Sequence, residues 1–183
     1  AVITSGGGFS EFNAAPASAG TPSAAYLNAP DPDPGYAAVG RGYPDLALAG
    51  YGYEVVIGGE LYTVSGTSCS APTVAGMTTL VNAIRLEAGA SPVGFINPTL
   101  YASEGAFAND VTSGNNKCVA ENEFCCDEGF AARGGWDATT GWGSVHFPAY
   151  EKVLTADLAP DAVERAKARL RARGAAKKKA APS

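Results

Sequence analysis

One serine stands in a crowded run of small residues that leads into a helix-like segment. Ser68 lies in the stretch VSGTSCSAPTVAG, residues 64–76. Pro72 is tolerated best in the first turn of a helix, so we expect the helix to start near Cys69–Ala71. The free N–H groups and the positive dipole end of that helix would face Ser68 and could stabilise an oxyanion. The spacing indicates a nucleophile, but Ser68 or Ser70 acting as a simple helix N-cap explains it equally well.

Two aspartates in glycine-rich segments could bind a cation. Asp110 precedes Val111 in NDVTSG, and Asp137 ends RGGWD, residues 133–137. Calcium prefers six or more oxygen ligands from carboxylates, carbonyls and water, and these segments could supply part of such a shell. The residues alone favour a simpler interpretation, in which both aspartates cap turns.

The pattern around Ser68 predicts the elements that must position it. Tyr53–Gly58 and Leu61–Ser65 alternate apolar and small residues about a Gly-Gly turn, which is typical of a β-hairpin. Over Ser70–Glu87, four apolar residues recur at helical spacing on one face: Val74, Met77, Val81 and Ile84. Ser68 is therefore expected between a strand and the N-terminus of a helix.

The remaining segments give weaker signals. We expect a surface loop over Asn13–Gly40 with one helical turn around Ala24–Asn28, and a second loop over Lys117–Gly129. Phe107–Val111 is predicted as a strand and Pro148–Ala156 as a short helix.

The charge of the chain is split between a basic tail and an acidic remainder. Eight of the 13 Lys and Arg but only two of the 18 acidic residues lie in Asp161–Ser183, so this tail carries +6 and the rest carries −11. Such a tail could contact nucleic acid or an anionic membrane. The simpler interpretation is a solvated, frayed helix, and we expect no nucleic-acid partner. No run of about 18 apolar residues predicts a membrane span.

The four cysteines favour a disulfide over a metal site. Cys118, Cys125 and Cys126 cluster in a polar loop, no pair of C-x-x-C motifs occurs, and the single His is distant. We expect one disulfide within Cys118–Cys126, which indicates an oxidising compartment. Cys69 is expected to be a buried free thiol. The first ten residues lack the charged and apolar regions of a signal peptide.

Six motifs, in order along the chain, resemble those of the sedolisin family of serine-carboxyl peptidases. They cover about residues 4–156, and one of them contains the family's S-G-T-S-x-S signature around Ser68. The motifs are TSGGGFS (4–10), GRGYPDLA (40–47), VSGTSCSAP (64–72), GFINPTLY (94–101), NDVTSG (109–114) and GGWDATTGWG (134–143).

This resemblance implies an α/β fold with a subtilisin-like parallel sheet flanked by helices, of which the chain would hold the C-terminal half. Residues 1–157 would belong to the peptidase domain, and residues 158–183 would form a basic, helical or disordered tail. Ser68 would be the nucleophile that forms an acyl-enzyme. Three glycines would line the substrate cleft, although they also fit a tight turn: Gly6, Gly7 and Gly8.

In the family the serine is activated by a glutamate that an aspartate orients, and a further aspartate serves the oxyanion hole. Carboxylates can act as bases at acidic pH, where their pKa lies near the working pH. These carboxylates lie upstream of the serine in the family, and no GDSG-like motif occurs here, so no base can be named. Asp45 matches a structural Y-P-D segment, and His146 is expected to be a surface or loop residue.

The resemblance also implies one structural calcium ion. Asp110 and Asp137 would supply side-chain oxygens, and Val111, Arg133 and Gly135 would supply carbonyls. Arg133 stands where the family often has Gly. A carbonyl ligand tolerates this replacement, although a nearby positive charge would weaken the site.

We therefore predict part of an acid-acting serine peptidase, either an endopeptidase or a tripeptidyl-peptidase. Its partners would be a peptide or protein substrate and the upstream part of its own catalytic domain, in a lysosome or outside the cell. This chain alone is expected to be inactive and to be molten or to aggregate. The main alternative is a catalytically inactive calcium-binding fragment or interaction module. A subtilisin-type enzyme fits less well, because of the late calcium loop and, as a weaker reason, because no histidine precedes Ser68 in this part of the domain.

Overall fold

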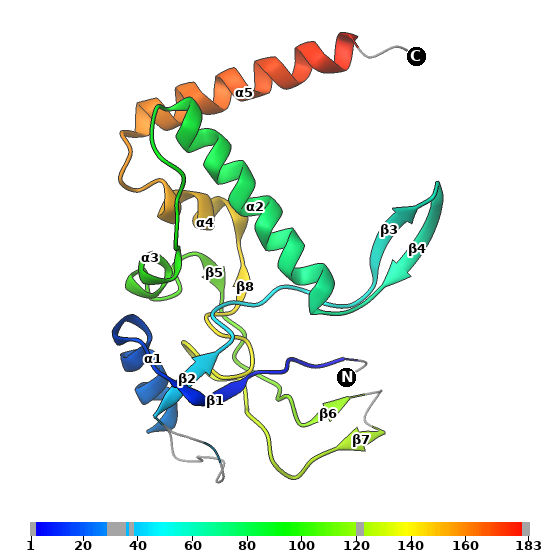
Figure 1. The fold of residues 1–183 in the computed structure, drawn as a ribbon, viewed down its shortest axis with the longest axis vertical. Coiled ribbons are helices and arrows are strands. Elements are labelled where there is room, and N and C mark those ends of the chain that lie inside the picture. The colour runs from blue at the N-terminus through cyan, green and yellow to red at the C-terminus, as the bar shows by residue number, and fades with distance from the viewer. Residues whose placement is uncertain (1–2, 29–35, 37–38, 120–122, 181–183) are drawn as a thin grey trace.

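The fold is built around one long helix, α2 (Thr67–Glu87), which runs through the upper half of the molecule in Figure 1. The computed structural model describes residues 3–28, 36, 39–119 and 123–180. The other helices are α1 (Ala17–Leu27), α3 (Asn97–Ala102), α4 (Phe147–Leu154) and α5 (Pro160–Ala180). The strands are β1 (Gly8–Ala14), β2 (Gly40–Tyr43), β3 (Tyr53–Ile57), β4 (Glu60–Val64), β5 (Ala108–Asn109), β6 (Cys118–Val119), β7 (Phe124–Cys125) and β8 (Ser144–Val145).

The strands form four antiparallel pairs: β1 with β2, β3 with β4, β5 with β8, and β6 with β7. Within the described residues, parallel pairing is limited to one isolated bridge between Ala47 and Ser144. The expected subtilisin-like parallel sheet is thus not formed by these residues. A parallel sheet needs several strands joined by crossovers, whereas β3–β4 and β6–β7 pair with their neighbours in sequence. A larger parallel sheet remains a prediction for the complete domain.

Helix α2 begins three residues before the predicted Ser70. Gly66 precedes it with φ +140°, a conformation that only glycine adopts readily. Pro72 therefore lies in the second turn, not in the first as expected. Because proline has no N–H, the carbonyl of Ser68 lacks its usual helical partner. The predicted C-terminal end at Glu87 is confirmed.

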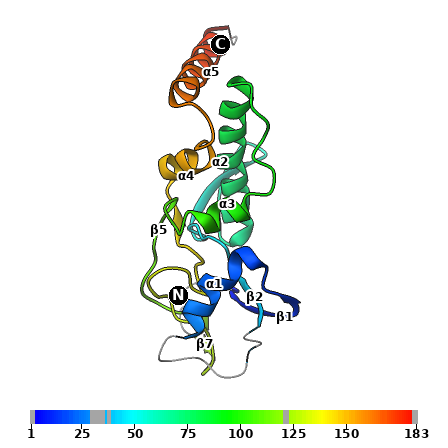
Figure 2. The same cartoon turned by 90° about the vertical axis from the view of Figure 1, so that its left-hand side faces the viewer.

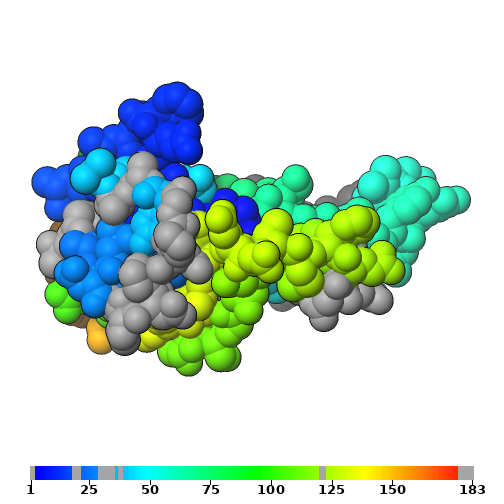
Figure 3. Space-filling view, turned by 90° about the horizontal axis from the view of Figure 1, so that it is seen from below, coloured from blue at the N-terminus to red at the C-terminus, as the bar shows by residue number. Residues whose placement is uncertain are grey.

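The other predicted elements are confirmed in kind but not always in extent. The hairpin at residues 53–64 agrees closely with the expectation, and its exposed apolar side chains include Val56 and Leu61. In Figures 1 and 3 this hairpin extends away from the rest of the chain. α1 is far longer than one helical turn, and the predicted loop over Lys117–Gly129 contains β6 and β7.

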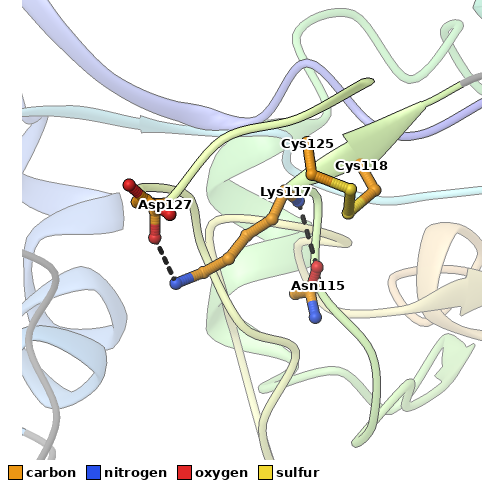
Figure 4. Close-up of a disulfide and its surroundings, with 5 residues drawn as sticks. All are labelled: Asn115, Lys117, Cys118, Cys125 and Asp127. Carbon is orange, nitrogen blue, oxygen red and sulfur yellow. Dashed lines mark hydrogen bonds between the residues drawn. A yellow bond between two sulfur atoms is a disulfide. The ribbon is translucent and has the colours of Figure 1, made fainter. Parts of the chain in front are cut away.

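A single disulfide joins Cys118 in β6 to Cys125 in β7 (Figure 4), which confirms the expected disulfide within this segment. Lys117 adds polar contacts there, since its Nζ donates to the carbonyl of Asp127 at 2.9 Å and its backbone N–H to Asn115 Oδ1 at 3.1 Å. Cys126 is free and exposed. Cys69 is free, as expected, but only half-buried, because it lies in the exposed first turn of α2.

The main core fills the space between α2, α3, α4 and the β5–β8 pair. Tyr150, Phe107 and Val81 are completely buried there, and Trp136 and Trp142 belong to the same cluster. This core fixes the loops around residues 45–48 and 137–143 because both pack against it. The remaining buried members are Phe9, Leu100, Tyr101, Ala138, Val145 and Leu154.

Helix α5 lies across the C-terminal end of α2 in both ribbon views (Figures 1 and 2). Val163 and Ala166 of α5 are buried against Ile84 of α2. The first half of the basic tail is therefore packed, unlike the solvated helix that we expected. None of the helices in the described residues has the length and apolar character that crossing a membrane requires.

Candidate functional site

Ser68 is the second residue of α2, and its side chain is exposed. It follows the hairpin and the short link Ser65–Gly66, as predicted, but it lies inside the first turn of the helix and not ahead of it as expected. Within the described part of the chain, its hydroxyl makes no hydrogen bond to another residue, so no carboxylate or imidazole is in position to accept its proton. The first turn leaves backbone N–H groups without helical partners, which suits the stabilisation of an anion.

Hydrogen bonds tie the residues on both sides of Ser68 to the segment before β3. The Gly66 N–H donates to the carbonyl of Gly50 at 2.6 Å. The Ser65 hydroxyl accepts the N–H of Gly52 at 3.1 Å, and the Ser70 hydroxyl donates to the carbonyl of Ala49 at 2.8 Å. The serine is thus held by its neighbours, not by its own side chain.

A largely apolar cavity of about 760 Å³ opens beside this turn. Gly6 and Gly7 line it together with Thr67 and Ser70 of α2; Ser68 itself does not. The other lining residues come from the segment Ile3–Ser5, from Tyr43–Leu48 and Gly50, and from Ala71, Val74, Ile96, Asn97, Leu100, Thr139 and Thr140. The structure therefore brings two of the three predicted glycines to the same cavity as the helix that carries Ser68.

The three glycines occupy different environments. Gly6 is exposed. A Cβ on Gly7 would lie 2.0 Å from the carbonyl oxygen of Ala138, so only glycine can come this close to the loop at residues 137–143. Gly8 is buried as the first residue of β1, where a Cβ would meet the Phe130 ring at 3.2 Å, and it does not line the cavity.

Asp45 lies at the edge of the cavity with its carboxylate fully engaged. Oδ1 accepts the Tyr101 hydroxyl at 2.8 Å and pairs with Arg41 at 2.6 Å, while Oδ2 accepts the Asn97 amide at 3.0 Å. Burial, helped by the negative charge of Asp45, raises the pKa of Tyr101, so this phenol stays a donor. The network supports the structural role predicted for Asp45, which makes no hydrogen bond to Ser68.

The carboxylate of Asp137 is completely buried within its own loop. Oδ1 accepts the N–H groups of Thr139 and Thr140 at 2.9 and 2.7 Å, and Oδ2 accepts the N–H of Arg133 at 2.9 Å. Burial raises the pKa of Asp137, and these N–H donors oppose the rise. The role of the two threonines was not predicted from the sequence, although an Asp followed by polar residues two and three positions later is a common turn signal.

Asp110, by contrast, is exposed and accepts one bond, from the N–H of Gly135 to Oδ2 at 2.8 Å. This contact connects the two predicted calcium segments. Val111 is half-buried beside Asp110. The Arg133 guanidinium lies over the Tyr26 ring, 5.4 Å from its centroid, so its charge has a partner of its own. Across the described residues, no three His, Cys, Asp or Glu side chains form a metal-binding group.

The chain is similar to several named proteins, although no family model matches it. It is 37% identical over 127 residues to physarolisin from Physarum polycephalum, a match that covers 66% of this chain and 22% of that protein. It is 41% identical over 155 residues to tripeptidyl-peptidase 1 from Canis lupus familiaris, covering 82% of this chain and 27% of that protein. The chain thus spans about a quarter of the length of these relatives.

A solved structure has the same fold over most of the chain. It is Pseudomonas sedolisin, a serine-carboxyl proteinase, complexed with two molecules of pseudo-iodotyrostatin. The TM-score is 0.61 at 22% sequence identity, over 83% of this chain and 37% of that one. This match identifies an α/β peptidase fold. From its relatives and its fold together, the chain belongs to the sedolisin family of serine-carboxyl peptidases, as a C-terminal part of the catalytic domain.

Proposed function

We propose that the intact protein carrying this chain is a serine peptidase that works at acidic pH, with Ser68 as its nucleophile. The observation that carries the proposal is the position of Ser68, exposed in the first turn of α2, whose neighbours Thr67 and Ser70 line a cavity together with Gly6 and Gly7. Relatives named tripeptidyl-peptidase support peptides as substrates. Release of tripeptides and internal cleavage are both within the proposal.

In this mechanism the Ser68 hydroxyl attacks the scissile carbonyl, the peptide C–N bond breaks, and the amine product leaves with the proton that the base took from Ser68. Water then hydrolyses the acyl-enzyme, which releases the carboxylate product and restores Ser68. The free N–H groups of the first turn of α2 favour the negative charge that develops on the carbonyl oxygen. The proton of Ser68 must pass to a base, and the described residues place none beside it. The proposal assigns that task to carboxylates from the upstream part of the catalytic domain, which suit an acidic working pH.

We further propose that one calcium ion binds between the Asp110 segment and the loop Arg133–Asp137. The two segments already meet through Gly135 and Asp110, and Asp110 Oδ1 is uncommitted. Asp137 and the carbonyls of Val111, Arg133 and Gly135 complete the oxygen-rich set that calcium prefers. The ion would fasten the late loop to the body of the fold. A chelator should then lower the melting temperature, and calcium should restore it; a melting curve indifferent to both would contradict this site.

The Cys118–Cys125 disulfide supports an oxidising compartment for the intact protein. We therefore propose a lysosomal or secreted location. Secretion of the protein by cells that express the whole gene would support this, and retention in the cytosol with both thiols reduced would contradict it.

The nucleophile is tested by Ser68→Ala in the intact protein, assayed on peptides at acidic pH. We expect peptide cleavage and labelling by a fluorophosphonate to disappear, while the melting temperature stays unchanged. Ser91→Ala, an exposed serine beyond the other end of α2, is the matched control and should remain active. Activity that survives Ser68→Ala would contradict the assignment. An inactive wild-type protein that melts in a calcium-dependent way would instead favour the non-catalytic calcium-binding alternative.

A further inference from the structure

Ser70 makes a different kind of hydrogen bond from Thr73 and Thr79 of the same helix. Those two threonines each donate to a carbonyl four residues earlier in α2, at 2.8 Å. Ser70 instead donates across to the carbonyl of Ala49, at 2.8 Å, in a segment that precedes the hairpin. Its hydroxyl thus links two parts of the chain that are 21 residues apart.

This link and two others bracket Ser68 on both sides. Before the nucleophile, Gly66 bonds to Gly50 and Ser65 bonds to Gly52; after it, Ser70 bonds to Ala49. Gly50 lies close to this turn. A Cβ on Gly50 would lie 3.4 Å from the Ser70 hydroxyl oxygen and 3.6 Å from the Gly66 carbonyl oxygen. Ser70 provides the only one of these three links that lies on the helical side of Ser68.

The helix itself holds this turn loosely. Pro72 cannot donate to the carbonyl of Ser68, so the first turn lacks the backbone bond that would normally fix its second residue. Two of the four residues of this turn are exposed and two are half-buried, so packing replaces that bond only in part. The hydrogen bond from Ser70 to Ala49 can therefore stabilise this turn where the helical bond is missing.

We propose that Ser70 is a positioning residue for Ser68: its bond to Ala49 fixes the first turn of α2 and, through the backbone, the direction of the nucleophile. This inference rests on the proposed function, and it assigns Ser70 no contact with the reacting atoms. The effect of such a residue falls on kcat, because a nucleophile displaced by about 1 Å can lose about 100-fold in rate while substrate binding is unchanged.

The test compares three variants of the intact protein in steady-state kinetics. Ser70→Ala should lower kcat about 10- to 100-fold with KM within about twofold of wild type. Ser70→Thr keeps the hydroxyl and should recover most of kcat. Thr79→Ala, which removes an exposed hydroxyl that bonds only within α2, should behave as wild type. Equal kcat in Ser70→Ala and wild type, an equal loss in Thr79→Ala, or no recovery in Ser70→Thr would each overturn the inference.

Amide hydrogen exchange provides a readout that does not depend on activity. The N–H groups of Gly66 and Cys69 are hydrogen-bonded to the carbonyls of Gly50 and Gly66, so they are the amides that report on this turn. Their exchange should rise several-fold in Ser70→Ala and stay unchanged in Thr79→Ala; unchanged exchange in both would overturn the inference. Ser68→Ala separates the two ideas. If that variant keeps activity, the proposed function fails. If it loses activity while Ser70→Ala keeps full kcat, only the positioning role of Ser70 fails.

Discussion

The two ends of α2 are held in contrasting ways. At the N-terminal end, around Ser68, a few polar bonds join an exposed turn to the segment Leu48–Gly52. At the C-terminal end, Ile84 is buried beneath α5, and Glu87 pairs with Arg173 at 2.6 Å and Arg169 at 3.6 Å.

We call the C-terminal end of α2, from Ile84 to Glu87, the packed end, and Arg85 is its central residue. It is only 9% exposed, and its guanidinium donates to two backbone carbonyls, those of Ser91 and Leu154, each at 2.8 Å. Two further bonds reach the carboxylate of Asp157 at 2.6 and 2.9 Å. One side chain thus connects α2, the segment that follows it and the end of α4.

On this description, the C-terminal end of α2 contributes mainly to stability, and the N-terminal end carries the proposed catalytic serine. The packed end fixes the helix axis, and the other end leaves Ser68, the proposed nucleophile, exposed between residues that hydrogen-bond to the segment before β3. Sites that must admit a substrate commonly lie in such less stable regions, supported by a rigid element. The following changes test how completely the two ends are separated.

The largest effect is expected at the packed end. Arg85→Met should lower the free energy of unfolding by about 2–4 kcal/mol, since it leaves the buried carbonyl of Leu154 and the partly buried carbonyl of Ser91 without this donor. Urea unfolding of the intact protein measures this. Arg171→Met is the control, because Arg171 is exposed and should stay within about 0.5 kcal/mol of wild type. If the free energy of unfolding of Arg85→Met equalled that of the control, Arg85 would not be a main source of stability at this end of α2.

A smaller loss of stability with a larger loss of activity is expected at the other end. Gly66→Ala forces a side chain into φ +140°, which should cost about 1–3 kcal/mol. Because the strain falls two residues before Ser68, peptide cleavage should decline far more than in a variant of equal stability at the packed end. Gly76→Ala, in the helix interior with open space around it, is the control and should keep its activity. Equal activity in Gly66→Ala and Gly76→Ala would mean that the backbone just before Ser68 is no more important for activity than the interior of α2.

The smallest effect concerns the pH dependence of the packed end. Hydrogen bonding to Arg85 lowers the pKa of Asp157, so the unfolded chain binds this proton more readily than the folded one. Its stabilising contribution is full above the ordinary pKa of about 3.9 and is lost as pH falls through the lowered value.

Asp157→Asn should therefore destabilise the protein by less than about 1 kcal/mol near neutral pH, since the side chain is 62% exposed. The difference from wild type should vanish in strongly acidic solution, as chemical unfolding at several pH values would show. Glu128→Gln, an exposed change outside this network, should show no such convergence. A constant difference for Asp157→Asn at every pH would contradict an ionic contribution from Asp157.

Much of this arrangement follows from local patterns in the sequence. Alternation about the Gly-Gly turn predicted the hairpin, helical spacing predicted α2 and its end at Glu87, and the clustered cysteines predicted the disulfide segment. These patterns are readable because turns, periodic faces and short-range pairings depend on neighbouring residues. Motif order predicted the family for the same reason, since each motif is a continuous stretch.

Contacts between distant segments were decided only by the tertiary structure. Neither the bond from Ser70 to Ala49 nor that from Gly135 to Asp110 has a local signal, and the packing of α5 on α2 was missed because a basic composition resembles that of a solvated helix. Helix α2 also starts earlier than Pro72 suggested, since Gly66 and its bond to Gly50 fix the entry of the chain. The local motif singles out Ser68 as the proposed nucleophile. The segment that hydrogen-bonds to its neighbours lies up to 21 residues earlier, so only folding brings the two together.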